Sequence, residues 1–191
     1  KLLRAGAQLI VTTRFPRDSA MRYAAEPDFK VWGHRLEIFG LDLRHTPSVE
    51  AFCKHLAATR TRLDFIINNA CQTVRRPPDF YKHMMELEQG PLQDLPEAAR
   101  RLLGAYEGLR GYHMLPEGAP AGRELAAQPG ISAAAGITHA AELSQVQLLP
   151  EEMAAQKGLF PEGKLDQDLQ QVDLRERNSW RLLMAEVPAV E

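Results

Sequence analysis

The stretch Leu63-Asp64-Phe65-Ile66-Ile67-Asn68-Asn69-Ala70-Cys71 is the part of the sequence most informative about the fold. A short apolar run that stops at two asparagines predicts a buried strand over residues 63–68, with a polar site at its carboxyl end. In open α/β sheets, ligands bind beyond the carboxyl ends of the strands. Paired Asn side chains can hold a sugar there and brace neighbouring backbone. Asn-Asn after a strand is also ordinary turn chemistry.

Two further apolar, β-branched runs lie upstream and predict strands over residues 8–13 and 36–42. A helix is expected over residues 18–25, and another begins at Thr46-Pro47, with Thr as the cap and Pro in the first turn. The second helix is expected to bury one face, made of Val49, Phe52, Cys53, Leu56 and Ala57. Alternating strands and helices predict an α/β fold with a partial Rossmann-like, doubly wound parallel sheet.

The character of the sequence changes near Pro77-Pro78. We therefore expect three regions: a partial nucleotide-binding domain over 1–76, a long and partly disordered helical insertion over 77–165, and a return segment over 166–191. Within the insertion, helices are expected over 79–88 and from Pro96 to about Arg110. The chain begins mid-pattern, with an apparent helix end at Gly6, and it stops in an apparent helix start. These features predict a fragment.

Composition excludes several classes of function. Hydrophobic residues make up 45% of the 191-residue chain and charged residues 25%, and the net charge is −2, so a soluble domain without a nucleic-acid or membrane partner is expected. No apolar run approaches the ~18 residues that span a bilayer. The two cysteines form no CxxC pair, which favours a reducing, cytoplasmic location. The histidines show no metal-ligand spacing, so no metal is expected.

Three short motifs, in this order, are typical of one family: Thr12-Thr13-Arg14, Leu41–Arg44 and Ile66–Cys71. With them, residues 1–76 resemble the short-chain dehydrogenase/reductase family. The tail over residues 170–188 is similar to a subgroup of large members that carry an insertion after the fourth strand.

The resemblance implies cofactor contacts at the ends of the first two strands. Thr13 and Arg14 would take the position where an acidic residue selects NAD and an Arg selects NADP, so NADP is expected. Arg17 would add a second positive charge, although arginines in a loop are also ordinary solvated surface. Asp42 would hydrogen-bond the adenine amino group and Leu43 would pack on the ring. Alternatively, Asp42 forms a turn before the next helix.

Further along, Asn68, Asn69 and Ala70 match the family's Asn-Asn-Ala-Gly motif on the adenosine ribose side. Cys71 replaces its Gly, which leaves the backbone path at that point open. The Gly-rich turn GxxxGxG and the catalytic Tyr-x-x-x-Lys are not present in this sequence. The chain therefore offers no catalytic residue of its own.

The resemblance predicts part of an oxidoreductase that transfers a hydride between NADP(H) and a small carbonyl or alcohol substrate, with a homo-oligomer also expected. The alternatives are a non-catalytic nucleotide-binding or protein-interaction module and a degenerate gene product without function. Because the strand that would separate two of the predicted strands is missing, we expect the isolated chain to fold poorly and to bind NADP weakly.

Overall fold

A computed structural model describes residues 1–70, 76–114, 135–146, 158–167 and 170–176 of the chain. The chain divides into two compact units. The first comprises Lys1–Arg60 and Leu87–Leu143, and the second comprises Thr61–Glu86 and Ser144–Glu191. The domain boundaries predicted at residues 76 and 165 rest on changes in amino-acid composition, whereas the two units are defined by contacts within the fold. The predicted boundaries therefore stay predictions.

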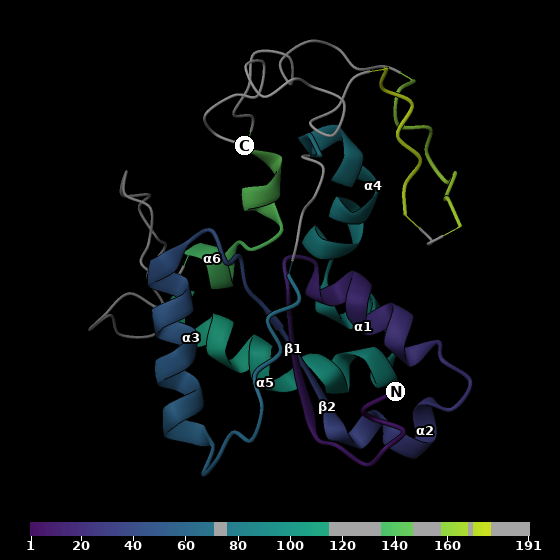
Figure 1. Ribbon diagram of the computed structural model, residues 1–191. Coiled ribbons are helices and arrows are strands. Elements are labelled where there is room, and N and C mark those ends of the chain that lie inside the picture. Colours follow the sequence, from purple (N-terminus) through teal and green to yellow (C-terminus); the bar gives the residue numbers. More distant parts are fainter. Residues whose placement is uncertain (71–75, 115–134, 147–157, 168–169, 177–191) are drawn as a thin grey trace. The chain divides into compact units, whose positions relative to one another are not determined.

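The first unit is built on two parallel strands, β1 (Leu9–Thr13) and β2 (Leu36–Gly40), which pair in register from Leu9 opposite Leu36 to Thr13 opposite Gly40 (Figure 1). A parallel pair needs a crossover connection. Here the crossover consists of α1 (Pro16–Ala24), α2 (Phe29–Trp32) and the 3-10 turn η1 (Gly33–Arg35). The predicted α/β class is thus confirmed, but the described residues contain only this two-stranded sheet and not a full Rossmann fold.

The core of the first unit lies on β2, where Ile38 and Phe39 have no exposed surface. Helix α5 (Glu97–Met114) packs against β2 and α1 (Figure 1). It confirms the predicted helix from Pro96 to about Arg110. The hydroxyl of Tyr106 on α5 sits where a side chain at position 40 would be, since a Cβ added to Gly40 would lie 2.3 Å from it. Glycine at this position is therefore a requirement of packing.

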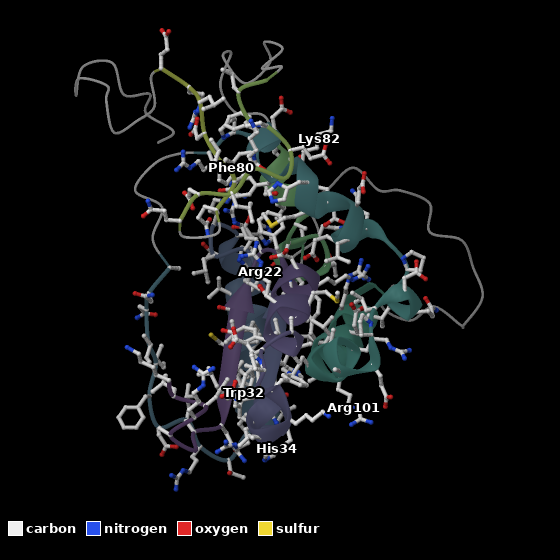
Figure 2. The ribbon with its side chains drawn as sticks, turned by 90° about the vertical axis from the view of Figure 1, so that its right-hand side faces the viewer. Arg22, Trp32, His34, Phe80, Lys82 and Arg101 are labelled. Carbon is white, nitrogen blue, oxygen red and sulfur yellow. The ribbon has the colours of Figure 1, made fainter. Side chains whose placement is uncertain are left out.

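Trp32 anchors the crossover at the other end of the unit (Figure 2). Its ring meets Tyr23 and Phe29 edge to face, with ring centroids 6.1 and 5.3 Å apart. Only 3% of the Trp32 surface is exposed. Aromatic pairs of this geometry stabilise a fold by more than the area they bury would contribute.

The helix end that was predicted before β1 is instead a turn, in which Gly6 has a φ of 96°.

Helix α3 (Thr46–Thr59) begins where it was predicted, but His45 takes the cap position and no side chain caps the helix. Its buried face is centred on Ser48 and Phe52, whereas Cys53 and Ala57, which were expected to be buried, are exposed. The short helix α6 (Ala135–Thr138) accounts for the difference between the predicted and the observed buried face of α3. The backbone N–H of Gly136 donates to Ser48 Oγ over 2.8 Å, which holds the Ser48 side of α3 inward.

Helix α4 (Pro78–Gln89) confirms the helix expected over residues 79–88, and it is followed by the 3-10 turn η2 (Leu92–Asp94). A further 3-10 turn, η3, covers Glu142–Gln145. In the second unit, Leu165 and Gln171 form an antiparallel bridge. Residues 115–134 and 147–157 of the predicted insertion lie outside the described residues, so the flexible segments expected within the insertion stay a prediction.

The strand predicted over residues 63–68 is wrong. This segment has no assigned secondary structure, and Phe65 and Ile66 are 85% and 74% exposed. A strand exists only where its backbone finds hydrogen-bonding partners on a neighbour. Among the described residues, the two strands of the sheet pair with each other and with no third strand.

Candidate functional site

The carboxyl ends of β1 and β2 form a common edge in the first unit. The parallel register brings Thr13 opposite Gly40, and beyond the last pair the backbone N–H of Leu41 donates to the Thr13 carbonyl over 2.9 Å. The residues that follow the two strands, beginning with Arg14 and with Leu41, therefore emerge side by side. This is the edge at which parallel α/β sheets bind ligands.

Thr13 and Arg14 are held by the turn into α1. Thr13 Oγ1 accepts a hydrogen bond from the backbone N–H of Phe15 over 3.1 Å, which stops the strand and starts the turn. The guanidinium of Arg14 lies over the Phe15 ring, 5.5 Å from its centroid. Because Phe15 itself is 7% exposed, this contact gives the half-buried Arg14 a fixed support.

Asp42 follows β2 and is almost completely buried, with 1% of its surface exposed. Its carboxylate accepts hydrogen bonds from the backbone N–H and Nε of Arg44, at 2.9 and 3.0 Å to Oδ1, and from Nη2, at 2.5 Å to Oδ2. Burial alone would raise the pKa of Asp42. The hydrogen bonds from Arg44 and the positive charges of Arg44 and Arg14 outweigh burial, so the pKa lies below its ordinary value and the group stays ionised.

These contacts show that Asp42 forms the turn that the sequence left open as an alternative. The Asp42 carboxylate binds the backbone N–H two residues on, as Asp commonly does before a helix. Its predicted contact with an adenine amino group stays a prediction, because that group would have to share a carboxylate that Arg44 already occupies. Leu43 beside it is 52% exposed, so it is accessible to a flat ring.

Asn68, Asn69 and Ala70 lie in the second unit, and all three are exposed. The backbone N–H of Asn69 donates to the carbonyl of Ile67 over 3.1 Å, which makes a local turn. Their predicted place beside the ribose stays a prediction. Cys71 lies outside the described residues.

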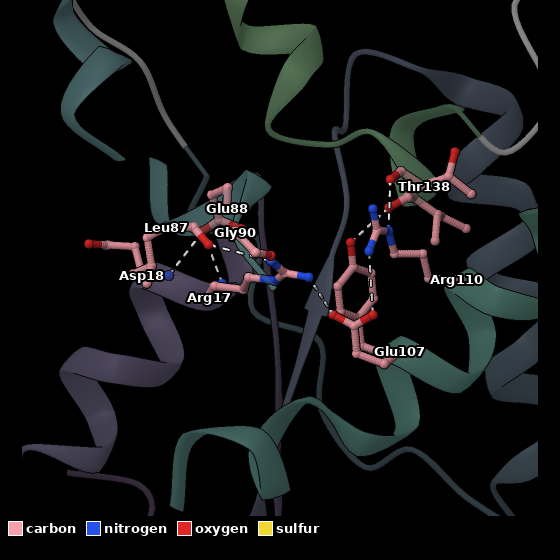
Figure 3. Close-up of polar contacts among 10 residues, drawn as sticks. Arg17, Asp18, Leu87, Glu88, Gly90, Glu107, Arg110 and Thr138 are labelled. Atoms are coloured by element: carbon pink, nitrogen blue, oxygen red, sulfur yellow. Dashed lines mark hydrogen bonds and ion pairs between the residues drawn. The ribbon is translucent and has the colours of Figure 1, made fainter. Parts of the chain in front are cut away.

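Arg17, expected to be a second charge beside Arg14, is instead buried at the start of α1 with 6% of its surface exposed (Figure 3). Its guanidinium donates to the Gly90 carbonyl and lies 3.6 Å from Glu107 Oε1. A guanidinium enclosed in this way is not available to a phosphate at the edge of the sheet. The expectation for Arg17 is therefore wrong, because residues 87–90 and α5 cover the start of α1.

Glu88, near the end of α4, completes this buried polar cluster (Figure 3). Its Oε1 accepts hydrogen bonds from the backbone N–H groups of Arg17 and Asp18, both over 2.9 Å, and so caps α1. Burial raises the pKa of Glu88 to about 7, against the lowering effect of these hydrogen bonds and of the Arg17 charge. Glu88 is not among the residues predicted from the sequence, although it falls on the same helical face as Tyr81 and Met85, which are also buried.

A raised carboxyl pKa beside arginines is a common sign of a functional site. Here Glu107 and Arg110 on α5 pair with each other, and Arg110 Nε also donates to the Thr138 carbonyl over 3.0 Å (Figure 3). The cavity among these side chains has room for about one water molecule. It is too small for a substrate, so the cluster is a structural element and the edge of the sheet is the candidate site.

No protein-family model, curated protein or solved structure matches this chain. Across the described ranges, no helix has the length and apolar character that crossing a membrane requires. Within the same ranges, no three His, Cys, Asp or Glu side chains gather closely enough to hold a metal ion.

Proposed function

We propose that the edge where β1 and β2 end is the adenosine side of an NADP site. The protein would then be a short-chain oxidoreductase that transfers a hydride between NADP(H) and a small carbonyl or alcohol substrate. The observation that carries this proposal is the parallel register, which sets Arg14 beside the turn at Asp42 within one compact unit. Ligand sites of parallel sheets form at such an edge.

The donor chemistry at this edge suits a phosphate monoester. Arg14 presents a planar guanidinium, which forms charge-assisted and often bidentate hydrogen bonds with phosphate. No acidic residue follows Thr13 directly, as would suit the free 2′-hydroxyl of NAD. Leu43, which follows Asp42 directly, offers an exposed apolar surface. The proposed roles are thus phosphate binding by Arg14 and packing of the base on Leu43.

In enzymes of this class NADPH donates the hydride to a carbonyl or NADP+ accepts it from an alcohol, and the protein supplies binding and orientation. The residues proposed here act only on the adenosine end of the cofactor. The proposal assigns no proton transfer to any residue of this chain, because the sequence holds no Tyr-x-x-x-Lys.

The test is the preference of the 191-residue chain for NADP over NAD, measured by NMR chemical-shift titration, which tolerates weak binding. We expect Arg14→Gln to lower this preference by about tenfold, since a hydrogen bond to a charged group contributes about 1.5 kcal/mol or more. Arg14→Asp should lower it further, because a carboxylate repels the 2′-phosphate.

Arg22→Gln is the matched control. Arg22 is another half-exposed arginine of the same unit, paired with Asp18 within α1 and 49% exposed. Replacing it should leave the preference unchanged. An unchanged preference in both Arg14 variants would reject the NADP assignment.

A second candidate is a non-catalytic interaction module. The observation that favours it is the run Leu63–Ile67, in which the side chains of Phe65, Ile66 and Ile67 are 85%, 74% and 66% exposed. Adjacent exposed apolar side chains of this size are typical of contact surfaces. If neither NADP nor NAD binds with a dependence on Arg14, this candidate is the better one.

A further inference from the structure

Arg44 lies at the same edge of the sheet as Arg14. The resemblance to the short-chain dehydrogenase/reductase family gives Arg44 no role. Its Nη2 atom donates to Asp42 Oδ2 over 2.5 Å and to the carbonyl of Leu143 over 3.2 Å. Its side chain is nevertheless 52% exposed. The guanidinium is thus fixed from two directions by groups of the same unit, and it still faces solvent. A charged group held in this way loses little conformational entropy when it binds a ligand.

The turn at this point does not require a guanidinium. The Asx turn is formed by the backbone N–H of Arg44, which donates to Asp42 Oδ1 over 2.9 Å. Any residue other than proline supplies that donor. The three further contacts of the Arg44 guanidinium with the Asp42 carboxylate keep that buried carboxylate ionised, and they also fix the orientation of the guanidinium.

A phosphate bound at this edge would also need a second positive charge beside that of Arg14. A phosphate monoester carries about −1.5 to −2 charges at neutral pH. Arg14 supplies one positive charge, and Arg17 is enclosed in the buried cluster. Arg14 follows β1 and Arg44 lies four residues beyond β2, and the parallel register ends both strands at the same edge of the sheet. The positive charges of Arg44 and Arg14 both lower the pKa of the Asp42 carboxyl.

We propose that Arg44 is the second phosphate-binding residue of this site, and that with Arg14 it binds the 2′-phosphate of the cofactor. Asp42 then acts as a positioning residue that aims the guanidinium of Arg44. This inference rests on the proposed function, and it replaces Arg17 by Arg44 as the second charge. Arg44 is thereby a determinant of specificity for a phosphorylated ribose.

The experiment compares two probes, adenosine 2′-monophosphate and adenosine, in NMR titrations of the 191-residue chain. We expect Arg44→Gln to weaken binding of the monophosphate about three- to tenfold, the effect of one partly exposed charge-assisted contact. Binding of adenosine should not weaken, because the base and the unphosphorylated ribose do not use Arg44. Arg44→Lys should fall between, since it retains the charge but lacks the planar fork.

Arg22→Gln is again the control and should affect neither probe. An equal loss for both probes in Arg44→Gln would mean that Arg44 only supports the turn, and it would overturn the inference. If Arg14→Gln lowers phosphate preference while Arg44→Gln does not, the inference fails and the proposed function stands. If Arg14→Gln has no effect, the proposed function itself fails.

A measurement on the unaltered chain keeps the test independent of folding of the variants. Phenylglyoxal modifies accessible arginines, and peptide mapping by mass spectrometry gives the rate at each position. We expect adenosine 2′-monophosphate to slow modification of Arg44 and Arg14, adenosine to slow neither, and both probes to leave Arg22 unaffected. Absence of protection at Arg44, with protection at Arg14, would overturn the inference.

Discussion

Two segments of the chain have nearly the same kind of sequence and opposite structures. Leu36–Gly40 reads Leu-Glu-Ile-Phe-Gly and is the buried strand β2, in which Ile38 and Phe39 have no exposed surface. Leu63–Ile67 reads Leu-Asp-Phe-Ile-Ile and is not a strand, and Phe65 and Ile66 are 85% and 74% exposed. The first segment has β1 beside it and α5 packed on it. Apolar, β-branched composition permits a strand, but only a partner makes one.

The largest expected effect is a difference in stability between variants of Ile38 in β2 and of Ile66 in the exposed segment. Ile38→Ala should lower the free energy of unfolding of the first unit by about 3 to 4 kcal/mol, because it removes a fully buried side chain and leaves a cavity. Ile66→Ala should change it by less than about 0.5 kcal/mol, as is usual for exposed positions. Urea denaturation followed by Trp32 fluorescence, in a Trp180→Phe background, gives both values. Equal losses in the two variants would contradict the comparison.

The second prediction concerns the buried cluster beside β2. The pKa of Glu88 is about 7 in the folded chain, against an ordinary value of 4.5, so the folded state binds the proton more tightly than the unfolded state. Its stabilising contribution is complete below pH 4.5 and is lost as the pH rises through about 7. Between pH 5 and pH 8 the first unit should lose about 2 to 3 kcal/mol through this group, since a tenfold change in proton affinity corresponds to about 1.4 kcal/mol.

Glu88→Gln should remove this part of the pH dependence. Glu86→Gln is the matched control, because Glu86 lies on the same helix and is exposed. Urea denaturation at several pH values between 5 and 8 measures the slope for each variant. If Glu88→Gln keeps the slope of the unaltered chain, Glu88 does not titrate in this range.

A smaller effect is expected where α5 covers β2. The hydroxyl of Tyr106 donates to the carbonyl of Ile137 over 2.9 Å, and Tyr106 is 4% exposed. Burial raises the pKa of this hydroxyl, so it remains a donor at neutral pH. Tyr106→Phe keeps the ring contact but leaves the carbonyl without this donor, which should cost about 1 to 2 kcal/mol. The same denaturation assay tests it, and unchanged stability would mean that water replaces the hydroxyl.

The smallest effect on the free energy of unfolding is expected at the exposed segment, where the change should appear in association instead. Phe65→Asp should leave stability within about 0.5 kcal/mol. It should reduce self-association in sedimentation velocity experiments, since an exposed apolar segment with strand propensity can pair with another copy. Val31→Asp, at a 68% exposed position of the first unit, is the control. Equal self-association in all three proteins would show that the exposed segment does not mediate it.

Sequence reasoning located both strands of the first unit and its helices α1, α3 and α5, because each is a local pattern, but it did not predict the short helices α2 and α6. The runs at 8–13 and 36–42, the Pro47 in the first turn of α3 and the apolar face of α5 are all visible within a few residues. It failed at residues 63–68 and at the buried face of α3, where Ser48 rather than Cys53 faces inward. Both failures depend on a distant segment, namely a partner strand in one case and Gly136 in the other.

The candidate site also contains some features that local sequence predicts and others that depend on distant residues. Arg14 and Asp42 were predicted at the ends of their strands, and the parallel register does bring these ends together. Arg17 was expected beside Arg14, but it is buried by partners 70 or more residues away, Glu88 and Gly90. Arg44 is paired locally with Asp42, and a distant contact with the Leu143 carbonyl also holds it. No local pattern contains these distant contacts.

The sequence by itself determined which segments can form strands and helices, and that the chain is of the α/β class, because hydrophobic periodicity and turn chemistry act over a few residues. Only the tertiary structure decided which of the apolar runs became a strand, which arginine was buried and which carboxyl has a raised pKa. Each of these depends on hydrogen bonds and desolvation supplied by residues far along the chain. At the proposed nucleotide edge, the sequence placed Arg14 at the end of one strand, and the fold brought the end of the other strand, which leads to Arg44, to the same edge.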